Sequence, residues 1–296
     1  MKSGMVGIIG RANVGKSTLL NQILGKKIAI TSDKSGTTRN IILGVYNDQE
    51  AQIAFVDTPG IRKPSNKLDI ILNNKSYQMT EPVSLILFIV DISKGFGKGD
   101  KYLLNNLKED DKKIILVLNK IDKINKEELI QRIDEISKEY QFLEIIPLSA
   151  IKNINTKELI KTIKKYLFEE GKYYDDNFIT NQPVSMIITE RVREKIMRLT
   201  DKEVPHTVTC IMEELEESNE IIKAKVNIIV DRENLKKIII GKKGNMLKEI
   251  GTKARIDLEE YFNKKVYLEL YVKTIKNWRE NDLLIKNLGL KEDLDE

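Results

Sequence analysis

A glycine-rich segment near the N-terminus has the residue types and spacing needed to bind phosphate. Residues 10–17 read GRANVGKS, the pattern G-x-x-x-x-G-K-[ST], after an apolar run and before a helix-like segment. The glycines allow a tight turn whose N–H groups point at phosphate oxygens, and the helix N-terminus adds its positive dipole end. A chance glycine turn is the alternative, but an eight-residue match with correct flanks argues against it. The expected phosphate-binding residues are Gly10, Arg11, Ala12, Asn13, Val14, Gly15, Lys16, Ser17 and Thr18.

A second motif is expected to select the base of a bound nucleotide. Asn119-Lys120-Ile121-Asp122 follows the apolar run Ile114–Leu118. The Asp122 carboxylate can accept hydrogen bonds from the ring N–H and the exocyclic amine of guanine, whereas adenine offers no matching pair. Asn119 would tie this loop to the phosphate loop, and the Lys120 stem would cover the base. The backbone of Ser149-Ala150, after another strand-like run, is expected near guanine O6. Alone, the N-K-x-D pattern is more typical of a solvated helix start than of a site, and Ser149 is typical of a polar turn. The position of N-K-x-D after a buried strand, downstream of the phosphate loop, favours a base-binding site instead.

Two further polar segments are expected to respond to the γ-phosphate. Asp57-Thr58-Pro59-Gly60 follows the run Ile53–Val56, so Asp57 would hold Mg²⁺ through water and the Gly60 amide would meet the γ-phosphate. Thr38 is the favoured hydroxyl ligand from the preceding polar loop, with Thr37 as the alternative. The expected Mg²⁺ ligands are therefore Ser17, Thr38 and Asp57. The expected catalytic residues are Lys16, Thr38 and Gly60, with Thr58 and Pro59 completing the nucleotide-binding loop.

The first half of the chain alternates strand-like and helix-like segments. This alternation predicts an α/β fold with a mainly parallel sheet covered by helices on both faces. The expected strands are Met5–Ile9, Ile41–Tyr46, Ile53–Val56, Leu85–Val90, Ile114–Leu118 and Glu144–Ile146. The expected helices are Ser17–Leu24, Lys126–Tyr140 and Thr156–Phe168.

The second half has a different character. We expect residues 1–170 to form the nucleotide-binding domain, 171–183 a polar linker, and 184–296 an α+β domain that ends in an acidic tail. In that domain the expected helices are Ser185–Leu199, Asn234–Ile240 and Asn245–Phe262. The expected strands are His206–Leu215, Ile221–Val230 and Val266–Val272, with a turn at Glu216–Glu220.

The segment Gly241-Lys242-Lys243-Gly244 has the G-x-x-G spacing of a loop that clamps single-stranded nucleic acid in a KH module. From Arg232 to Arg255 eight basic and two acidic residues occur, although residues 181–296 as a whole are neutral, with 22 of each sign. Positive charge is thus concentrated around the loop, as a phosphate-tracking groove requires; a solvated helix face is the alternative. The order of elements matches a type II KH module. The expected RNA-binding residues are Ile240, Gly241, Lys242, Lys243, Gly244, Lys248, Lys253 and Arg255, and Ile239 is either part of an apolar platform for bases or core.

Composition excludes several other classes. The chain has 296 residues, a formal net charge of +5, one cysteine and one histidine. A lone cysteine cannot form an internal disulfide, which fits a reducing cytoplasm, and one cysteine with one histidine argues against a structural zinc site. No apolar stretch approaches the ~20 residues of a membrane span, and no signal peptide is apparent.

With all five nucleotide motifs in the usual order, residues 5–168 resemble the Ras-like GTPases of the translation-factor-related class. This resemblance implies hydrolysis of GTP to GDP and phosphate with Mg²⁺. One departure stands out: Ile61 occupies the position after the switch glycine where Ras-like proteins carry a water-orienting glutamine. Either another group orients the water or intrinsic hydrolysis is slow. Asn13 resembles the asparagine that helps bind K⁺ in potassium-activated relatives, the alternative being that it only shapes the loop.

Both halves together resemble the Era family, bacterial Ras-like GTPases with a C-terminal KH domain. The resemblance covers nearly the whole chain, including Glu203–His206, Ile238–Gly244 and Lys265–Lys273. It implies binding to the 3′ region of 16S ribosomal RNA and a role in assembly of the 30S subunit. It also implies a cytoplasmic location with peripheral contact to the inner face of the membrane; the expected assembly state is a monomer.

Two other functions stay open at this stage. The first is a guanine-nucleotide-binding RNA chaperone with negligible hydrolysis, which Ile61 keeps open. The second is a GTPase whose C-terminal region contacts protein. A tandem-domain ribosome GTPase is disfavoured because only one phosphate loop occurs.

Overall fold

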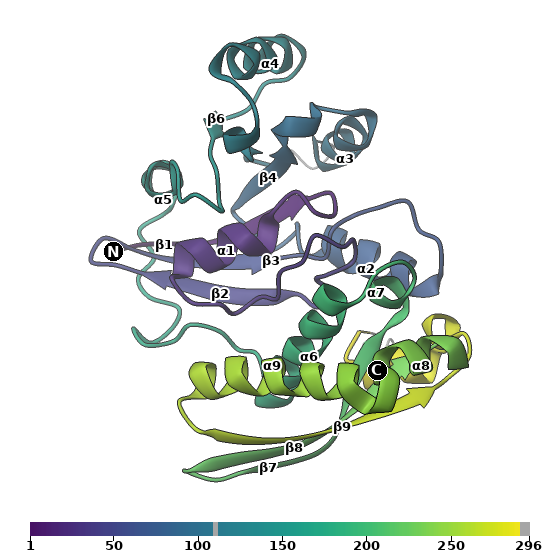
Figure 1. Ribbon diagram of the computed structural model, residues 1–296. Coiled ribbons are helices and arrows are strands. Elements are labelled where there is room, and N and C mark those ends of the chain that lie inside the picture. Colours follow the sequence, from purple (N-terminus) through teal and green to yellow (C-terminus); the bar gives the residue numbers. More distant parts are fainter. Residues whose placement is uncertain (109–111, 291–296) are drawn as a thin grey trace. The chain divides into compact units, whose positions relative to one another are not determined.

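The computed structural model describes residues 1–108 and 112–290, so the expected acidic tail at 291–296 lies outside the described residues (Figure 1). The chain forms two compact units. The first comprises Met1–Thr31, Gly36–Ser65 and Asp69–Asn181, and the second begins at Gln182 and includes the short segments 32–35 and 66–68.

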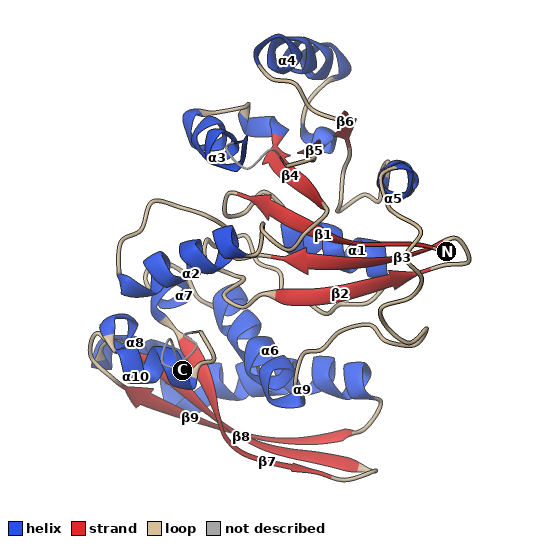
Figure 2. Ribbon diagram, turned by 180° about the vertical axis from the view of Figure 1, so that it is seen from behind, coloured by secondary structure: helices blue, strands red, loops and turns tan. Residues whose placement is uncertain are grey.

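A six-stranded sheet in the order β2-β3-β1-β4-β5-β6 organises the first unit (Figure 2). Its strands are β1 (Lys2–Gly10), β2 (Ile42–Asn47), β3 (Ala51–Asp57), β4 (Leu85–Asp91), β5 (Ile114–Asn119) and β6 (Glu144–Pro147). Only β2 is antiparallel to its neighbour; all other pairs are parallel. Every residue of β3, β4 and β5 is buried, as expected for strands covered on both faces. The predicted mainly parallel sheet is confirmed.

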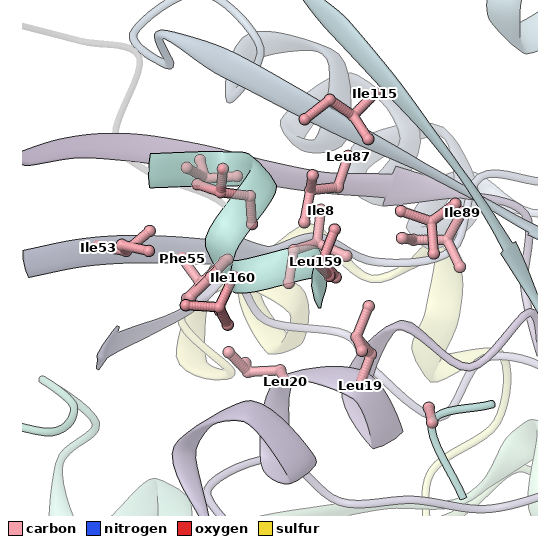
Figure 3. Packing of buried hydrophobic residues seen from close by; sticks show 14 of the residues in the cluster. Ile8, Leu19, Leu20, Ile53, Phe55, Leu87, Ile89, Ile115, Leu159 and Ile160 are labelled. Atoms are coloured by element: carbon pink, nitrogen blue, oxygen red, sulfur yellow. The ribbon is translucent and has the colours of Figure 1, made fainter. Parts of the chain in front are cut away.

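Helices cover both faces of this sheet. On one face, α1 (Lys16–Leu24) and α5 (Thr156–Lys165) contribute Leu19, Leu20 and Leu159 to a core that also contains strand residues such as Ile8 and Phe55 (Figure 3). On the other face, a second core gathers residues of α3 (Lys98–Lys108) and α4 (Lys126–Glu139) with the opposite side chains of the strands. Helix α2 (Lys67–Gln78) adds Tyr77 to the edge of this second core. The carboxyl ends of the parallel strands are therefore held between the helices that pack on the two faces of the sheet.

The segment after α5 runs along the edge strand β2. The Val45 N–H donates to the carbonyl of Ile179 across 2.8 Å, and Ile179 packs on the α1–α5 core. The Gln52 side chain accepts hydrogen bonds from the N–H groups of Tyr173 and Tyr174 at 2.7 and 2.9 Å. These contacts place residues 173–179 with the first unit.

The second unit is a three-stranded sheet with helices on one face. Its strands β7 (Thr209–Glu217), β8 (Ile221–Val230) and β9 (Lys265–Thr274) lie in the order β7-β8-β9, with β7 antiparallel and β9 parallel to β8. Figures 1 and 2 show α6 (Val184–Leu199) and α9 (Asn245–Phe262) on the same face. Short helices α7 (Val204–Thr207), α8 (Glu233–Ile240) and α10 (Asp282–Asn287) complete the unit. The helix–strand–strand–helix–helix–strand order is the one predicted from the sequence.

Some boundaries differ from the prediction. The strand expected from His206 begins at Thr209, because Pro205 sits at the start of the short helix α7, a position that suits its fixed φ. Glu216 and Glu217 continue β7 instead of forming the turn. The helix expected to reach Phe168 ends at Lys165, and the Ser3 N–H donates to the Phe168 carbonyl at 2.8 Å instead. Helices α2 and α3 were not predicted. Across the described residues, no helix combines the length and apolarity needed to span a bilayer.

Candidate nucleotide and RNA sites

The phosphate loop connects β1 to α1. Gly10, Asn13 and Gly15 have positive φ values of 155°, 65° and 102°, conformations that glycine and asparagine adopt most readily. A side chain at Gly10 would collide with the Ile89 carbonyl of β4. The sequence pattern therefore corresponds to a backbone that turns tightly beside β4 before α1 begins.

Lys16 lies inside this loop. It is only 6% exposed, and its Nζ donates to the carbonyls of Gly10 and Arg11, each at 3.0 Å. Burial lowers the pKa of Lys16 to about 8, although the nearby Asp57 carboxylate opposes the shift. An ammonium group is thus held beside the loop carbonyls, where a phosphate oxygen would be its natural partner.

Three oxygen-bearing side chains from different elements meet beside Lys16. The Ser17 hydroxyl on α1 donates to Oδ2 of Asp57 at 2.6 Å, and the Thr38 hydroxyl lies 2.7 Å from the same Ser17 oxygen. Asp57 is fully buried at the end of β3, and its Oδ1 has no hydrogen-bond partner within the described part of the chain. Burial raises the pKa of Asp57 to about 6, against the opposing effects of Lys16 and Ser17.

This group fits Mg²⁺. Two hydroxyls and a carboxylate are hard donors, and the unpartnered Asp57 oxygen is a position that a cation or its bound water would satisfy. Thr37 is buried at 9% exposure, and the hydroxyl that lies beside Ser17 Oγ is that of Thr38. Of the two threonines, Thr38 is the one that the fold brings to the predicted ligands.

The loop after β3 is held mainly by its own side chains. The buried Thr58 hydroxyl donates to the Ile8 carbonyl at 3.0 Å, and the Pro59 carbonyl accepts from Ser76 of α2 at 3.0 Å. Gly60 lies so close to the phosphate loop that an added Cβ would be 2.6 Å from Cα of Ala12. Thr58 and Pro59 therefore position the loop, while Gly60 is the residue that faces the phosphate-loop backbone.

The side chain of Ile61 is part of a hydrophobic core. It is 5% exposed in the cluster that also contains Phe88 and Val90 of β4, and its N–H donates to the Gly10 carbonyl at 3.3 Å. Arg62, next in sequence, is bound to the nearly buried Asp69, which also accepts from Ser65. The position that carries glutamine in Ras-like proteins is thus a packing position here.

Asn119 joins three loops at the end of β5. Its Nδ2 donates to the Val14 carbonyl at 2.8 Å, and its Oδ1 accepts from the N–H groups of Lys120 and Ala150 at 2.8 and 3.0 Å. Asp122 is exposed and accepts a hydrogen bond from the buried Ser149 hydroxyl. The predicted base-binding residues are therefore brought together, with the Asp122 carboxylate at the surface.

The side chain of Lys120 contacts Asp91, a residue that the sequence did not predict as part of the site. Lys120 has a positive φ of 69°, and its Nζ donates to the Asn13 carbonyl and to Oδ2 of Asp91, each at 2.7 Å. Burial would raise the pKa of Asp91, but the hydrogen bonds from Lys120 and Ser93 outweigh it and lower the pKa. The available signal was an acidic residue directly after the buried run Leu85–Val90.

Two phosphate-loop residues lie at the edge of the site. Arg11 is half-exposed and pairs with Asp100 of α3 at 3.5 Å. Thr18 lies on the first turn of α1, immediately after Ser17, and is partly buried.

In the second unit, the G-x-x-G loop links α8 to α9. Gly241, Lys243 and Gly244 have positive φ values of 70°, 52° and 79°. A Cβ at Gly241 would lie 2.6 Å from Cβ of Met246, whereas one at Gly244 would meet nothing within 4 Å. Lys242 and Lys243 are both exposed. Gly241 thus allows the tight turn, and Gly244 leaves open surface beside the two lysines.

The other predicted RNA-binding residues do not form one surface. Ile240 is partly buried, and Ile239 is fully buried in the core, which settles Ile239 as a packing residue. On α9, Lys248 and Arg255 are seven residues apart and share a face, whereas Lys253 is turned ~140° from Lys248. Lys253 and Arg255 pair within the helix, with Glu249 and Glu259, each at 2.8 Å.

Comparison with known proteins agrees with both units. Residues 5–120 match a family described as 50S ribosome-binding GTPase, and residues 203–279 match the KH domain family. The chain is 43% identical to GTPase Era of Staphylococcus haemolyticus over 295 residues, covering 99% of both proteins. It is 45% identical to GTPase Era of Thermoanaerobacter sp. over 290 residues, covering 97% of this chain and 96% of the relative.

Two solved structures match with the same TM-score of 0.96 and 44% identity, each covering 99% of this chain and 100% of the other. One is a variant of Aquifex aeolicus Era bound to GDP·AlF4⁻, and the other is Era in complex with MgGDPNP and nucleotides 1506–1542 of 16S ribosomal RNA. This similarity extends over the Ras-like unit and the KH unit alike. The chain belongs to the Era family of GTPases.

Proposed function

We propose that this chain hydrolyses GTP to GDP and phosphate and binds the single-stranded 3′ region of 16S ribosomal RNA through its KH unit, acting in assembly of the 30S subunit. The observation that carries the proposal is the full-length match to an Era structure that holds both MgGDPNP and the 3′ nucleotides of 16S RNA. Both halves needed for the two activities are present in one chain.

The residues of the first unit account for GTP binding. The N–H groups of the loop 10–17 and the Lys16 ammonium hold the β- and γ-phosphates. Ser17 and Thr38 would hold Mg²⁺ directly and Asp57 would hold it through water, and the bound ion would supply positive charge beside the phosphate oxygens. Asp122 accepts from guanine, and Asn119 keeps the base loop in register with the phosphate loop through Val14.

Water orientation requires a group other than residue 61, because the Ile61 side chain is buried and aliphatic. We propose K⁺ near the β- and γ-phosphates, with the Asn13 side chain as one of its ligands. Asn13 suits this role because its positive φ of 65° turns the loop at this residue. Its main-chain carbonyl accepts a hydrogen bond from Lys120 Nζ, which leaves the side chain as the part of Asn13 that would bind the ion.

The burial of Ile61 also favours a second candidate, a guanine-nucleotide-binding RNA chaperone with negligible intrinsic hydrolysis. Single-turnover hydrolysis with and without RNA separates the two. An enzyme releases phosphate in one turnover at a rate that responds to RNA, whereas a chaperone keeps GTP intact through many cycles of RNA binding and release.

For RNA binding, the exposed Lys242 and Lys243 beside the open face of Gly244 are the residues with the best access to a phosphate backbone. Replacing both by alanine should weaken binding to a 16S 3′-terminal oligonucleotide and lower the slope of log affinity against log salt by about 2. A matched control is the pair Lys223→Ala and Lys225→Ala on β8, which removes the same charge from residues paired with Glu216 and Glu214. Unchanged binding in the 242/243 variant would refute the RNA assignment.

The remaining proposals concern the domain boundaries, the assembly state and the location of the protein. Residues 1–170 serve as the GTPase domain, 171–183 as the linker and 184–296 as the RNA-binding domain. We further propose that the protein works in the cytoplasm as a monomer and that any contact with the inner membrane face is peripheral. Size-exclusion chromatography with light scattering and flotation with anionic vesicles test the last two statements.

A further inference from the structure

Arg62 follows the loop that is expected to meet the γ-phosphate, and helix α2 holds its main chain. The Asn73 side chain of α2 accepts from the Arg62 N–H at 3.3 Å and donates to the Arg62 carbonyl at 2.7 Å. Ser76, three residues further along α2, donates to the Pro59 carbonyl at 3.0 Å. These hydrogen bonds fasten the loop after β3 and Arg62 to the same helix.

The side chain of Arg62 is also held in place. Its Nε and Nη2 both donate to Oδ1 of Asp69, the Nε at 3.2 Å, and Asp69 is only 1% exposed on the first turn of α2. The other carboxylate oxygen accepts from the Ser65 N–H and hydroxyl at 3.0 and 2.8 Å. Burial alone would raise the pKa of Asp69, but the hydrogen bonds from Arg62 and Ser65 outweigh it and lower the pKa. An ionised, buried carboxylate therefore fixes the orientation of the guanidinium group.

The same guanidinium group lies against Gly36, two residues before Thr38. A Cβ built at Gly36 would lie 3.2, 3.4 and 3.6 Å from Nη1, Nη2 and Cζ of Arg62. The first two distances are shorter than an ordinary van der Waals contact, and the φ of 76° at Gly36 also favours glycine. The loop that carries Thr38 thus packs closely on an arginine that is fixed by the loop after β3 and by α2.

Thr38 is the residue on which this packing bears. Its hydroxyl lies 2.7 Å from Ser17 Oγ, in the group of oxygen donors that fits Mg²⁺. Residues that orient a metal ligand affect metal affinity even when they do not bind the ion. Arg62 would act on the Thr38 hydroxyl in this way, through the short stretch of backbone between Gly36 and Thr38.

We propose that Arg62 is a positioning residue that joins the two loops expected to respond to the γ-phosphate. It keeps the loop at Gly36 against the loop after β3, and it thereby keeps the Thr38 hydroxyl beside Ser17. This inference rests on the proposed binding of GTP with Mg²⁺. Because the switch loops of GTPases are ordered by the γ-phosphate and its metal ion, the contribution of Arg62 belongs to the triphosphate-bound state.

Arg62→Ala tests the role of the arginine in the full-length protein. The measurement is the dissociation rate of a fluorescent, non-hydrolysable GTP analogue across a Mg²⁺ titration. The Mg²⁺ concentration that gives half-maximal retention should rise about tenfold. The same titration with fluorescent GDP should stay close to wild type. Lys63→Ala removes the exposed neighbouring charge and should behave as wild type with both nucleotides.

Gly36→Ala tests the contact from its other side and leaves the pair of Arg62 with Asp69 in place. The added methyl group meets the guanidinium group, so it should also raise the Mg²⁺ requirement for the GTP analogue. Gly25→Ala is the matched control, because Gly25 has a positive φ of 62° and a Cβ there would meet nothing within 4 Å. In an Arg62→Ala background the clash is absent, so Gly36→Ala should then add no more than Gly25→Ala does.

A double variant shows whether Arg62 acts through Thr38. Arg62→Ala combined with Thr38→Ala should need no more Mg²⁺ than Thr38→Ala alone, because both changes remove the same ligand from the ion. Effects that multiply would show that the two residues act independently and would overturn the proposal.

The other outcomes separate this inference from the proposed function. Slower turnover of Arg62→Ala at an unchanged Mg²⁺ requirement would overturn the proposal and make Arg62 a group that acts on the phosphates. Equal losses with the GTP analogue and GDP would overturn it as well, because Arg62 would then only stabilise the fold. If wild-type protein retains the analogue equally well without Mg²⁺, the proposed function fails and this inference with it. Should Arg62→Ala unfold by circular dichroism, the comparison of Gly36→Ala with Gly25→Ala decides the question, and equal Mg²⁺ requirements would overturn the proposal.

Discussion

The side-chain amide of Asn119 donates to the main-chain carbonyl of Val14 at 2.8 Å, a buried hydrogen bond between residues 105 apart in the chain. The same side chain accepts from the Ala150 N–H at 3.0 Å. The predicted phosphate loop and the two predicted base-binding loops are thereby fixed relative to one another through one residue. We therefore expect recognition of the base and of the phosphates to be structurally coupled within the first unit.

Replacing Asn119 by alanine should destabilise the protein even without nucleotide. The change leaves the Val14 carbonyl and the N–H groups of Lys120 and Ala150 without this partner, at a cost of about 2–4 kcal/mol in the free energy of unfolding. Urea denaturation measures the loss, and titration with fluorescent GDP should show weaker binding. Asn287→Ala, on the exposed side of α10, is the control and should change neither quantity. A wild-type unfolding curve for Asn119→Ala would show that the three loops are held by other contacts.

The two neighbouring threonines should differ in their effect on hydrolysis. Thr38→Ala removes a hydroxyl 2.7 Å from Ser17 Oγ, so it should raise the Mg²⁺ concentration needed for half-maximal turnover at least about tenfold. Thr37→Ala leaves the contact between Thr38 and Ser17 in place, so it should keep the Mg²⁺ requirement close to wild type. The measurement is GTP turnover across a Mg²⁺ titration, and an inverted order of the two variants would assign the ligand to Thr37.

Potassium should accelerate hydrolysis through Asn13. At equal ionic strength we expect turnover to be about tenfold faster in KCl than in NaCl, because a cation near the β- and γ-phosphates stabilises charge developing there. Asn13→Gly preserves the positive φ of the loop and removes the side chain, so it should abolish the difference without preventing GTP binding. Equal rates of the wild-type protein in the two salts would remove K⁺ from the mechanism.

An ion pair at the opposite end of the sheet should make stability depend on pH. Burial alone would raise the pKa of Asp48, but hydrogen bonds from Lys164, from the N–H groups of Glu50 and Ala51 and from Tyr46 outweigh it and lower the pKa to about 2. A carboxyl group whose pKa is depressed on folding stabilises the protein fully above its unfolded pKa of 3.8, and this contribution disappears as the pH falls toward 2.

Asp48→Asn should therefore lower the free energy of unfolding by about 1 kcal/mol at pH 7, a value reduced for partial solvent exposure. The difference from wild type should shrink between about pH 4 and pH 2 in urea denaturation. Asp134→Asn, which breaks an exposed pair with Lys138 on α4, is the control and should cost little at any pH. A pH-independent cost for Asp48→Asn would point to lost hydrogen bonds alone.

The sequence predicted the strands and the site loops well because both carry strong local signals. Buried parallel strands are continuous apolar runs, and β4 and β5 begin where those runs begin. The phosphate loop is likewise predictable from its glycines and from Asn13, because the fold requires positive φ angles at these positions. Such features depend on neighbouring residues, so the sequence alone is sufficient.

Structural features that depend on residues distant in the chain could not be predicted from local sequence patterns. Helix α2 exposes Ile70 at 50%, so its apolar residues do not follow a clean helical period. Asp91 becomes a site residue only because the chain brings Lys120 to it 29 residues later. The Thr58 hydroxyl donates to the carbonyl of Ile8 in β1, a contact that no local pattern indicates. Tertiary contacts, not local pattern, decide these roles.

The most direct test of guanine recognition is a comparison of GTP, xanthosine triphosphate and ATP binding by wild-type protein and the Asp122→Asn variant, with Mg²⁺ present. Xanthine carries an oxygen where guanine carries its exocyclic amine, so an asparagine at 122 would donate where the aspartate accepts. We predict that wild-type protein binds GTP at least ~10³-fold more tightly than ATP, and that Asp122→Asn loses this preference and binds xanthosine triphosphate instead. Equal affinity of the wild-type protein for GTP and ATP, or an unchanged GTP preference in the variant, would contradict the account.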